Sequence, residues 1–423
     1  MTWKGTILRK EGKGMKKETL MELLRDYDSF YLYDEEVIRE HTRRLKKDLP
    51  GVEFLYSIKC NPHRLVVRSV FEEGFGADAA SLGEVLLARE QGLEAENIYY
   101  SAPGKTEKDI SAALGRCVLI ADSISEVERI QKTAAAAGVT AKIGVRLNPG
   151  FGFGGGEGGP SKFGIDEDRA MAVLPEWMAL SNVEVVGLHV HMRSQVLDAG
   201  LLGRYYESLF ELAERFQTAL GRPLAFLNMG SGIGLPYALT DTALDTAGLG
   251  ERVRELMERF RSRLPGIRIL IEVGRYAVGK SGVYVTKVVD KKVSRGVTYV
   301  VLKNTLNGFI RPSLARLVMS YAAEEKPKGS EPLFTAPDAF GFCPLTADER
   351  EEETVTLVGN LCTATDVMAQ GVTLPRLEVG DGVAVTNAGS YAAVLSPTQF
   401  SGQTPPAELF LTVKGEILEG LEE

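Results

Sequence analysis

The chain has 423 residues, of which 44% are hydrophobic and 25% are charged, and its formal net charge at pH 7 is -8. This length predicts two or three domains, and the composition is that of an ordinary globular protein. The negative charge argues against a nucleic-acid partner, because phosphate backbones are bound by basic surfaces. No apolar run is long enough to span a bilayer, and residues 1–5 lack the apolar core of a signal peptide, so we expect no membrane partner.

The four cysteines, at positions 60, 117, 343 and 362, have neither the spacing of metal ligands nor the density of a disulfide framework. We therefore expect no metal site and a reducing, cytoplasmic compartment.

From about residue 30 to 275, short apolar runs alternate with amphipathic segments. We expect strands at 30–33, 54–58, 98–100, 118–120, 142–147, 183–190, 224–229 and 267–272. Helices are expected between them, for example at 35–49, 82–91, 125–137, 202–220 and 249–264. Roughly eight such units predict an α/β fold with a (β/α)8 barrel of the TIM type over residues 31–275. An open doubly wound sheet is the alternative.

After residue 276 the pattern changes. Strands are expected at 283–289, 298–301, 354–358, 382–386 and 409–413, without intervening helices. This predicts a separate C-terminal β domain over residues 276–423. We expect residues 1–30 to pack with this domain, with an added strand at 3–8, and residues 320–353 to form a charged surface excursion. The glycine-rich run 150–160 predicts a flexible loop, and a lid is one use for it.

One lysine stands out in Phe54-Leu-Tyr-Ser-Ile-Lys-Cys-Asn-Pro-His63. An apolar strand carries Lys59 to its carboxyl end, just before the Asn61-Pro62 turn. A lysine in a desolvated pocket has a lowered pKa and becomes a nucleophile toward carbonyls. A lysine that snorkels from a strand end explains the motif equally well. In a barrel the carboxyl ends of the strands face the active site. The polar residues expected there are Lys59, Asp78, Arg146, His189, His191, Glu272 and Arg275.

Two stretches later in the barrel could hold a phosphate and a ring nitrogen. Gly230, Ser231 and Gly232 follow an apolar strand, and glycines let backbone N–H groups cradle a phosphate, although a tight turn would also need them. Glu272 and Arg275 end the next strand. Arginine pairs with phosphate and glutamate could accept a hydrogen bond from a protonated ring nitrogen, whereas the alternative is a Glu–Arg ion pair.

Histidine, cysteine and tyrosine supply three further candidates. His189 and His191 would share one face of a strand, where an imidazole could stack on a flat cofactor or serve only the core. Metal binding is disfavoured because no third ligand is suggested nearby. Cys362 lies among polar residues, as a reactive thiol does, although a small buried hydrophobe is the alternative. Tyr391 lies in Asn387-Ala-Gly-Ser-Tyr391.

Together these signals describe one ligand. The lysine suits an aldehyde, the glycines and arginine suit a phosphate, and the glutamate suits a ring nitrogen. Pyridoxal phosphate has all three groups, and it acts as an electron sink for carbanions.

The order of these motifs resembles the fold-type III pyridoxal-phosphate decarboxylases, the group of diaminopimelate and ornithine decarboxylases, from about residue 28 to 413. The resemblance implies an alanine-racemase-like barrel with a β domain. It also implies a head-to-tail homodimer with active sites at its interface, and decarboxylation of a small amino-acid substrate.

The resemblance also implies a role for each motif residue. Lys59 looks like the Schiff-base lysine, and Asp78 with Glu84 the acidic pair near it. His191 matches the histidine that stacks on the pyridine ring, and Glu272 the partner of its nitrogen. The phosphate contacts are matched by Ser194, Gly230, Ser231, Gly232, Arg275 and Tyr391, although the family usually has glycine in place of Ser231. Cys362 matches the catalytic cysteine that crosses the dimer interface and donates a proton. The similar racemases have an arginine where Glu272 stands, so a racemase is disfavoured.

The substrate residues depart from the diaminopimelate pattern. Arg193 replaces a glycine, and Thr363 replaces the glutamate that binds the substrate's distal ammonium. Losing a buried charge partner costs several kcal/mol, so diaminopimelate is disfavoured. Arg311 remains in its Arg-Pro motif, but the tyrosine that follows there is missing. We expect Arg193 and Arg311 to hold an extra substrate carboxylate, although a salt bridge is the alternative for Arg193. Thr363 and Asp366 are also expected in the substrate site.

These departures look more like a specialised branch, whose members decarboxylate siderophore intermediates such as citryl-diaminopropionate, or carrier-tethered glutamate. A diaminopimelate decarboxylase of lysine biosynthesis is the first alternative. A non-catalytic regulator that keeps the fold is the second, and the joint retention of Lys59, Glu272 and Cys362 argues against it.

Overall fold

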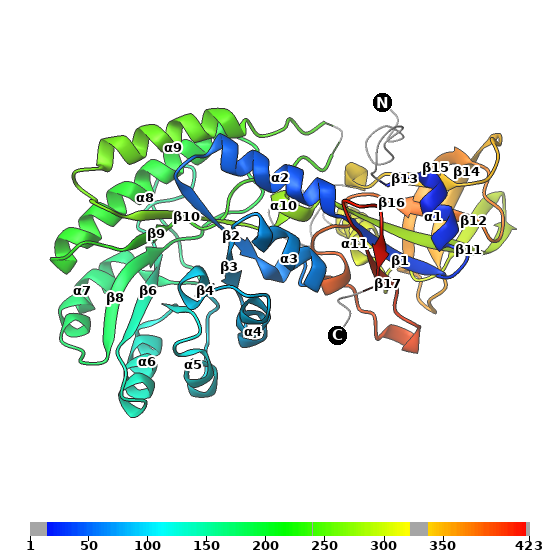
Figure 1. Ribbon diagram of the computed structural model, residues 1–423. Coiled ribbons are helices and arrows are strands. Elements are labelled where there is room, and N and C mark those ends of the chain that lie inside the picture. Colours follow the sequence, from blue (N-terminus) through cyan, green and yellow to red (C-terminus); the bar gives the residue numbers. More distant parts are fainter. Residues whose placement is uncertain (1–14, 239, 322–336, 420–423) are drawn as a thin grey trace.

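The computed structural model describes residues 15–238, 240–321 and 337–419, which form two bodies side by side along the long axis of the molecule (Figure 1). An α/β barrel holds the middle of the chain, and a β domain holds its start and end. The strand expected at residues 3–8 lies outside the described residues.

The barrel consists of eight parallel strands. Their order is β5-β4-β3-β2-β10-β9-β8-β6, and β6 pairs with β5 to close the ring. This confirms the predicted barrel and excludes the open doubly wound sheet. The strands are β2 (Val52–Ser57), β3 (Gly76–Ala79), β4 (Ile98–Tyr100), β5 (Val118–Ala121), β6 (Ala141–Asn148), β8 (Val183–His189), β9 (Phe226–Asn228) and β10 (Arg268–Val273).

Helices surround this ring and begin at polar caps. The Asp34 side chain, for example, accepts a hydrogen bond of 2.9 Å from the Glu36 N–H at the start of its helix. The barrel helices are α2 (Glu35–Asp48), α3 (Arg64–Glu72), α4 (Leu82–Glu90), α5 (Glu107–Ala113), α6 (Ile124–Ala136), α7 (Glu167–Met178), α8 (Ala199–Leu220), α9 (Thr246–Phe260) and α10 (Arg275–Val278). A two-residue strand, β7 (Ile165–Asp166), extends β6, and short 3-10 turns lie at η2 (Ile58–Cys60) and η3 (Ala95–Asn97).

The interior of the barrel is packed with side chains. Phe226 lies there with Tyr99, and their ring centroids are 5.1 Å apart at an interplanar angle of 77°. A Cβ atom at Gly187 would come within 2.4 Å of the Phe226 ring, so glycine is required beside it. Because this core fills the ring, a ligand can enter the barrel only at a strand end.

The strand expected at 30–33 does not belong to the barrel. It is β1 (Ser29–Asp34), which pairs with β11 and β17 of the β domain. The barrel strand that the sequence pattern missed is β3, whose four residues Gly76–Ala79 carry little apolar signal.

The β domain is one curled sheet. Its order is β15-β14-β12-β11-β1-β17-β18, and β16 joins β11 to β13. The strands are β11 (Gly282–Ser294), β12 (Val297–Leu302), β13 (Phe342–Leu345), β14 (Glu352–Gly359), β15 (Val367–Pro375), β16 (Gly382–Val385), β17 (Ala407–Leu411) and β18 (Ile417–Leu418), with 3-10 turns η4 (Pro337–Ala339), η5 (Ala393–Leu395) and η6 (Phe400–Gly402). The helix α1 (Lys17–Leu23) packs on this sheet through Leu20.

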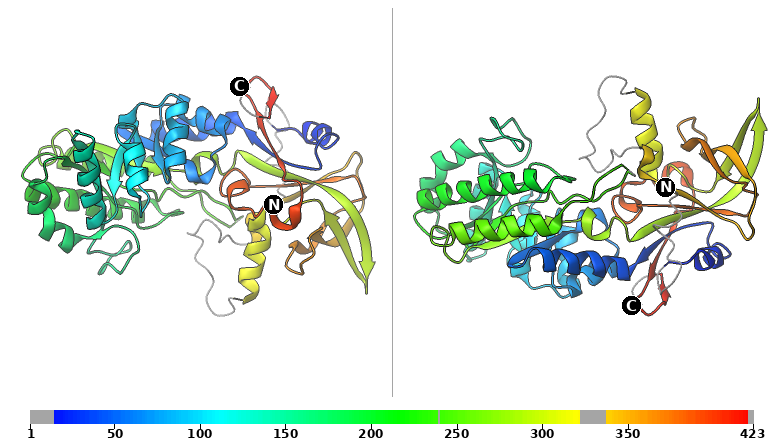
Figure 2. Two further views of the ribbon diagram at one scale, coloured as in Figure 1. Left: turned by 90° about the horizontal axis from the view of Figure 1, so that it is seen from below. Right: turned by 90° about the horizontal axis from the view of Figure 1, so that it is seen from above.

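The β domain also contains a helix, so the expectation of strands alone was wrong. This helix is α11 (Ile310–Tyr321), which stands out beside the sheet in both views of Figure 2. The predicted surface excursion at 320–353 likewise contains strand β13, whose residue Leu345 is buried.

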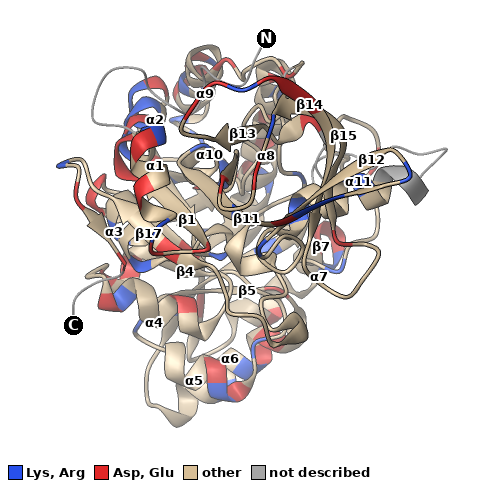
Figure 3. Ribbon diagram, turned by 90° about the vertical axis from the view of Figure 1, so that its right-hand side faces the viewer, with Lys and Arg blue, Asp and Glu red and all other residues tan. Residues whose placement is uncertain are grey.

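Acidic and basic residues are mixed along the surface helices, as α2 shows in Figure 3. Arg39 of α2 pairs with Glu73 at 2.8 Å and with Glu72 at 2.5 Å, which fastens α2 to the end of α3. Within the described ranges, no helix has the length and apolar character needed to cross a membrane.

Candidate active site

A cavity opens at the carboxyl ends of the barrel strands, where the β domain meets the barrel. Seven of the residues predicted for the site line it. The lining consists of Ser57, Lys59, His191, Ser194, Gln195, Ser231, Ile233, Glu272, Gly274, Arg275 and Tyr391.

Lys59 lies in the η2 turn that directly follows β2. Its Nζ is 3.2 Å from Oδ2 of Asp78, a fully buried carboxylate that also accepts hydrogen bonds from Ser57 (2.8 Å) and Ser101 (2.6 Å). Partial burial lowers the pKa of Lys59, whose side chain is 43% exposed, but the charges of Asp78, Tyr391 and Glu272 outweigh it and raise this pKa above its ordinary value. The expected lowering was therefore wrong, because Asp78 stabilises the ammonium. The same contact holds the amine at the cavity.

Glu84, the second member of the predicted acidic pair, caps a backbone turn. Its carboxylate accepts a hydrogen bond of 2.7 Å from the Ala80 N–H at the start of α4. Burial and the charge of Asp78 raise the pKa of Glu84 to about 7, although the Ala80 hydrogen bond and Lys59 lower it. The carboxyl group is therefore half protonated near neutral pH.

Glu272, at the end of β10, is held as a buried carboxylate. Its Oε1 lies 3.0 Å from Nε2 of His189 and accepts a hydrogen bond of 3.0 Å from Nδ2 of Asn228. Burial raises the pKa of Glu272, but His189, Lys59 and His191 lower it more, so this pKa lies well below its usual range. Glu272 therefore presents a negative charge to the cavity. Neither it nor Arg275 forms the alternative Glu–Arg ion pair among the described residues.

The two histidines have different surroundings. His189 ends β8 and lies behind Glu272, whereas His191 lies beyond the strand and lines the cavity. Nδ1 of His191 accepts a hydrogen bond of 3.0 Å from the Ser231 N–H, which places the ring proton on Nε2, 3.3 Å from Oγ of Ser194. Burial lowers the pKa of His191 to about 3. A neutral imidazole therefore forms this wall of the cavity.

Backbone geometry shapes the glycine loop after β9. Gly230 has a φ of 67°, and a Cβ atom there would lie 2.4 Å from the Val190 carbonyl oxygen, so no other residue fits without a shift. Gly232 has a φ of 148°. The Arg275 guanidinium lies across the cavity, with Cζ 5.3 Å from the ring centroid of Tyr391. The N–H groups of Gly230 and Ser231 already donate to Asn228 and His191, so the group beside this loop that suits a phosphate is the Arg275 guanidinium.

The β domain supplies Tyr391 to the cavity. The Tyr391 N–H donates a hydrogen bond of 2.8 Å to the Cys60 carbonyl, and the Asn61 side chain donates one of 2.9 Å to the Gly389 carbonyl. The turn that carries Lys59 is thus joined to the β-domain loop 387–391. Burial raises the pKa of Tyr391 to about 12, although Lys59 lowers it, so its hydroxyl stays protonated.

Two residues predicted to bind substrate are instead buried and form hydrogen bonds within the chain. Arg311 is 0% exposed, and its Nη1 donates a hydrogen bond of 3.0 Å to the Ser390 carbonyl. Asp366 is 3% exposed and accepts hydrogen bonds of 3.0 Å from the N–H groups of Leu306 and Leu361. Their polar atoms hold β-domain loops in place, so the structure does not bring them to the cavity surface.

Three other predicted residues are exposed or half-buried. Cys362 is exposed and does not line the cavity of its own chain. Thr363 is half-buried beside it, and its hydroxyl lies 2.9 Å from that of Thr365. Arg193 is exposed, its Cζ lies 5.8 Å from the ring centroid of Phe153, and it forms no salt bridge with any described residue. The alternative of a structural ion pair for Arg193 is thus not seen.

Sequence reasoning missed Gln195, Ser57 and Asn228. Gln195 directly follows Ser194 and has a φ of 60°, and its side-chain oxygen accepts a hydrogen bond of 3.1 Å from the Leu235 N–H. Its place beside Ser194, a predicted phosphate contact, was a usable signal. Asn228 and Ser57 act through buried partners that nothing local in the sequence reveals.

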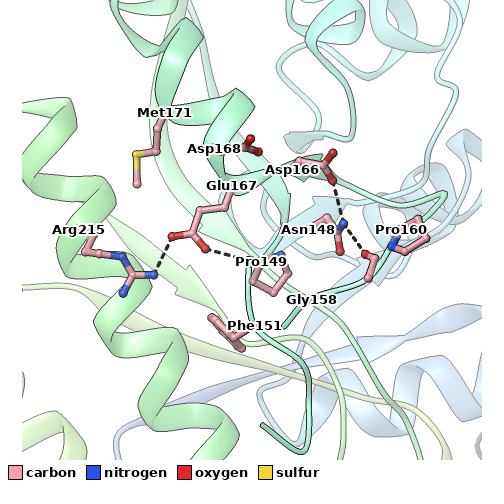
Figure 4. A pocket seen from close by; sticks show the side chains of 12 residues that line it. Asn148, Pro149, Phe151, Gly158, Pro160, Asp166, Glu167, Asp168, Met171 and Arg215 are labelled. Atoms are coloured by element: carbon pink, nitrogen blue, oxygen red, sulfur yellow. Dashed lines mark hydrogen bonds and ion pairs between the residues drawn. The ribbon is translucent and has the colours of Figure 1, made fainter. Parts of the chain in front are cut away.

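The glycine-rich loop is fastened on its outer side, around a surface hollow between the loop and helices α7 and α8 (Figure 4). The Gly150 N–H donates a hydrogen bond of 3.0 Å to Glu167, which also pairs with Arg215 at 2.7 Å. The Asn148 amide donates to the Gly159 carbonyl (3.0 Å) and to Asp166 (2.8 Å). A lid role for this loop stays a prediction.

An amine aimed into the cavity, a neutral imidazole wall, a charged carboxylate and a guanidinium fit the aldehyde, ring, nitrogen and phosphate of pyridoxal phosphate. On a (β/α)8 barrel with an added β domain, they define a pyridoxal-phosphate enzyme of the alanine-racemase-like fold. No cluster of three or more potential metal ligands occurs in the part of the chain that the structure describes.

The chain belongs to the pyridoxal-dependent decarboxylases, since residues 35–279 match the family described as "Pyridoxal-dependent decarboxylase, pyridoxal binding domain". It is therefore a carboxy-lyase that uses pyridoxal phosphate to remove carbon dioxide from an amino acid. When bound, this cofactor supplies the electron sink for the carbanion that decarboxylation leaves.

The chain aligns with known relatives over most of their length. The chain is 32% identical to the L-glutamyl-[BtrI acyl-carrier protein] decarboxylase of Niallia circulans, covering 90% of this chain and 88% of the relative. It is 27% identical to the 2-[(L-alanin-3-ylcarbamoyl)methyl]-2-hydroxybutanedioate decarboxylase of Staphylococcus aureus, covering 90% and 94%. The crystal structure of Helicobacter pylori diaminopimelate decarboxylase with L-lysine superposes with a TM-score of 0.79 at 25% identity, covering 94% of each chain.

Proposed function

We propose that the chain decarboxylates an amino-acid derivative whose far end is a carboxylate or an acyl group, as in specialised metabolites such as siderophore intermediates. Arg193 carries this proposal. It is an exposed arginine that directly precedes Ser194 of the cavity lining, and no described acid pairs with it. A guanidinium so placed suits a substrate carboxylate, which it can bind through two parallel hydrogen bonds.

The residue after Cys362 supports the same substrate class. A substrate with a free distal ammonium needs an acid in the site, but Thr363 offers only a hydroxyl and Asp366 is buried among backbone N–H groups. The names of two relatives supply a parallel, since one acts on a glutamyl group on a carrier protein and the other on a hydroxybutanedioate derivative.

We propose that Lys59, Asp78, His191 and Glu272 hold the cofactor's reactive end. The Lys59 amine would bind the aldehyde, with Asp78 as its proton partner. Glu272 would keep the ring nitrogen protonated, because its carboxylate stays ionised. His191, neutral and fixed by Ser231, would pack on the ring face.

We further propose a cytoplasmic homodimer with its active sites at the interface. Cys362 is exposed in one chain, although a proton donor works in a site from which water is excluded. A second chain that covers Cys362 would supply this enclosure. None of the four cysteines forms a disulfide, which agrees with a reducing compartment.

The test is carbon dioxide release by the cofactor-loaded enzyme across a substrate panel. The panel holds meso-diaminopimelate, lysine, ornithine, arginine, glutamate, citryl-diaminopropionate and a carrier-tethered glutamate. We expect the highest kcat/KM on one of the last two. Faster turnover of meso-diaminopimelate would overturn the substrate proposal and favour lysine biosynthesis.

A further inference from the structure

Tyr237 lies in a buried cluster of cations next to the cavity. It is 4% exposed and ends the glycine loop that follows β9. Three cationic groups lie near its ring centroid: Cζ of Arg311 at 5.0 Å, Cζ of Arg275 at 5.7 Å and Nζ of Lys280 at 5.7 Å. All three distances fall within the range of a cation–π contact.

The hydroxyl of Tyr237 reaches the β domain. Its oxygen is 3.0 Å from Oγ of Ser390, and the Ser390 carbonyl accepts the hydrogen bond from Arg311 of α11. Ser390 precedes Tyr391, whose ring centroid lies 5.3 Å from Cζ of Arg275. Tyr237 therefore joins the glycine loop and Arg275 of the barrel to two segments of the β domain.

The two guanidinium groups destabilise one another. Burial lowers the pKa of Arg311, and the charge of Arg275 lowers it too, whereas Tyr237 raises it. Arg311 nevertheless keeps its charge at neutral pH because an arginine does not lose its proton in a protein. The electron-rich face of an aromatic ring offsets part of the repulsion between Arg311 and Arg275 without neutralising either charge.

The surrounding chain leaves room for this tyrosine. A Cβ atom at Gly279 would lie 3.0 Å from the Tyr237 oxygen and 2.7 Å from the Arg275 carbonyl oxygen, so the hydroxyl occupies space that only glycine leaves open. Asp241 fixes the backbone at the same place, because its carboxylate accepts hydrogen bonds from the N–H groups of Tyr237 (2.8 Å) and Ala238 (2.9 Å).

We propose that Tyr237 is a positioning residue whose ring holds the Arg275 guanidinium toward the cavity, where Arg275 meets the phosphate of pyridoxal phosphate. The proposal rests on the phosphate role of Arg275 and is independent of the substrate. In this proposal Tyr237 contacts neither cofactor nor substrate. Its ring holds the Arg275 guanidinium in place against the repulsion of Arg311.

The test compares two probes, pyridoxal phosphate and pyridoxal, which differ only in the phosphate. Each is titrated into cofactor-depleted protein, and the dissociation constants are measured by absorbance. In Tyr237→Leu, which removes the ring, we expect pyridoxal phosphate to bind about tenfold more weakly while pyridoxal binds as in the wild type. Tyr237→Phe keeps the ring and should stay within about threefold of the wild type. Tyr237→Met provides a second ring-free variant if Tyr237→Leu does not fold.

Two controls separate the possible failures. Arg275→Ala must show the same phosphate-selective loss; if it does not, the phosphate role of Arg275 is wrong and the Tyr237 proposal falls with it. Tyr99→Leu removes a buried tyrosine in the barrel core, the middle residue of β4, and should not change the ratio of the two constants. The Tyr237 proposal alone is overturned if Arg275→Ala behaves as expected but Tyr237→Leu binds both probes like the wild type, or loses both equally.

Discussion

The barrel half and the β-domain half of the site differ in how firmly their residues are held. On the barrel side, Asp78 and Glu272 are almost fully buried, and each is held by at least two side chains. On the β-domain side, Cys362 is exposed and Thr363 contacts little besides its own loop. The two carboxylates that would act on the cofactor are thus fixed, whereas Thr363 and the proposed proton donor Cys362 lie on an exposed loop.

Electrostatics explains this division. A buried carboxylate is stable only if it is paired and hydrogen-bonded, so the barrel side tolerates few substitutions. An exposed loop residue carries no such constraint. On the proposed function, we expect a few loop positions, such as 193 and 363, to set the substrate on a barrel that stays unchanged.

The largest effect is expected when the barrel half and the β-domain half of the site are inactivated on different chains. We expect Lys59→Ala and Cys362→Ala each to lose nearly all activity as pure proteins. If each site takes its lysine from one chain and its cysteine from the other, mixing and re-pairing the two variants restores about a quarter of wild-type activity, since half of the dimers then carry one intact site. No recovery in carbon dioxide release, with re-pairing shown by mass spectrometry, would contradict a shared site.

Glu272→Gln tests the barrel half. The amide fills the same space but cannot keep a ring nitrogen protonated, and we expect kcat to fall roughly 10²–10³-fold, as when one preorganised electrostatic group is removed. Glu126→Gln is the matched control, because Glu126 is equally buried but pairs with Lys105 outside the cavity. This control should lose stability and keep its kcat. Equal kcat losses in both variants would mean that burial, and not position, sets the effect.

Thr363→Glu tests the β-domain half. It introduces an acid where a distal ammonium would bind, and we expect kcat/KM for meso-diaminopimelate to rise about tenfold, which corresponds to one new charged hydrogen bond. Thr365→Glu adds the same charge two residues away and should have less effect. If neither variant changes the preference between diaminopimelate and carboxylate-rich substrates, position 363 does not select the substrate.

We expect a smaller, pH-dependent effect on stability at the boundary between the barrel and the β domain. His63 follows the lysine turn and packs against Phe410 and Tyr33 of the β domain, and burial lowers its pKa to about 4. A histidine with a lowered pKa binds its proton more weakly in the folded state than in the unfolded state. Its contribution to the free energy of unfolding is therefore complete above pH 6.5 and is lost as the pH falls toward 4. The loss reaches about 2 kcal/mol at pH 5.

His63→Phe keeps the ring contacts and removes the proton site. Calorimetry of both proteins at pH 7 and pH 5 should show a smaller fall in melting temperature for the variant. An equal or larger fall would mean that His63 does not titrate in this way.

Much of the fold could be predicted because local signals suffice for it. Seven of the eight barrel strands follow from apolar runs between amphipathic helices, but β1 was misplaced. The strand–cap–helix pattern of residues 29–48 is also that of a barrel unit, and only its pairing with β11 and β17, far along the chain, shows that it belongs to the β domain. Strand β3 was missed because Gly76-Ala-Asp-Ala79 lacks branched apolar residues.

Prediction of the site has the same limit, because contacts between residues far apart in the chain cannot be seen in the sequence. Lys59, His191, Glu272 and Arg275 were found because they lie at strand ends in recognisable motifs, and the cavity brings them together. Arg311 and Asp366 were expected at the substrate because sequence alone does not show that a charged side chain is buried. Their partners, Ser390 and Leu306, lie 79 and 60 residues away.

Substitution of Arg193 tests most directly the central claim that this arginine selects an anionic substrate. The measurement is kcat/KM of the wild type, Arg193→Ala and Arg193→Lys on carrier-tethered glutamate and on citryl-diaminopropionate. We predict that Arg193→Ala loses roughly 10- to 100-fold on the preferred substrate, mainly through KM, and that Arg193→Lys recovers part of the loss. An unchanged kcat/KM for Arg193→Ala on both compounds would contradict the claim that this arginine selects an anionic substrate.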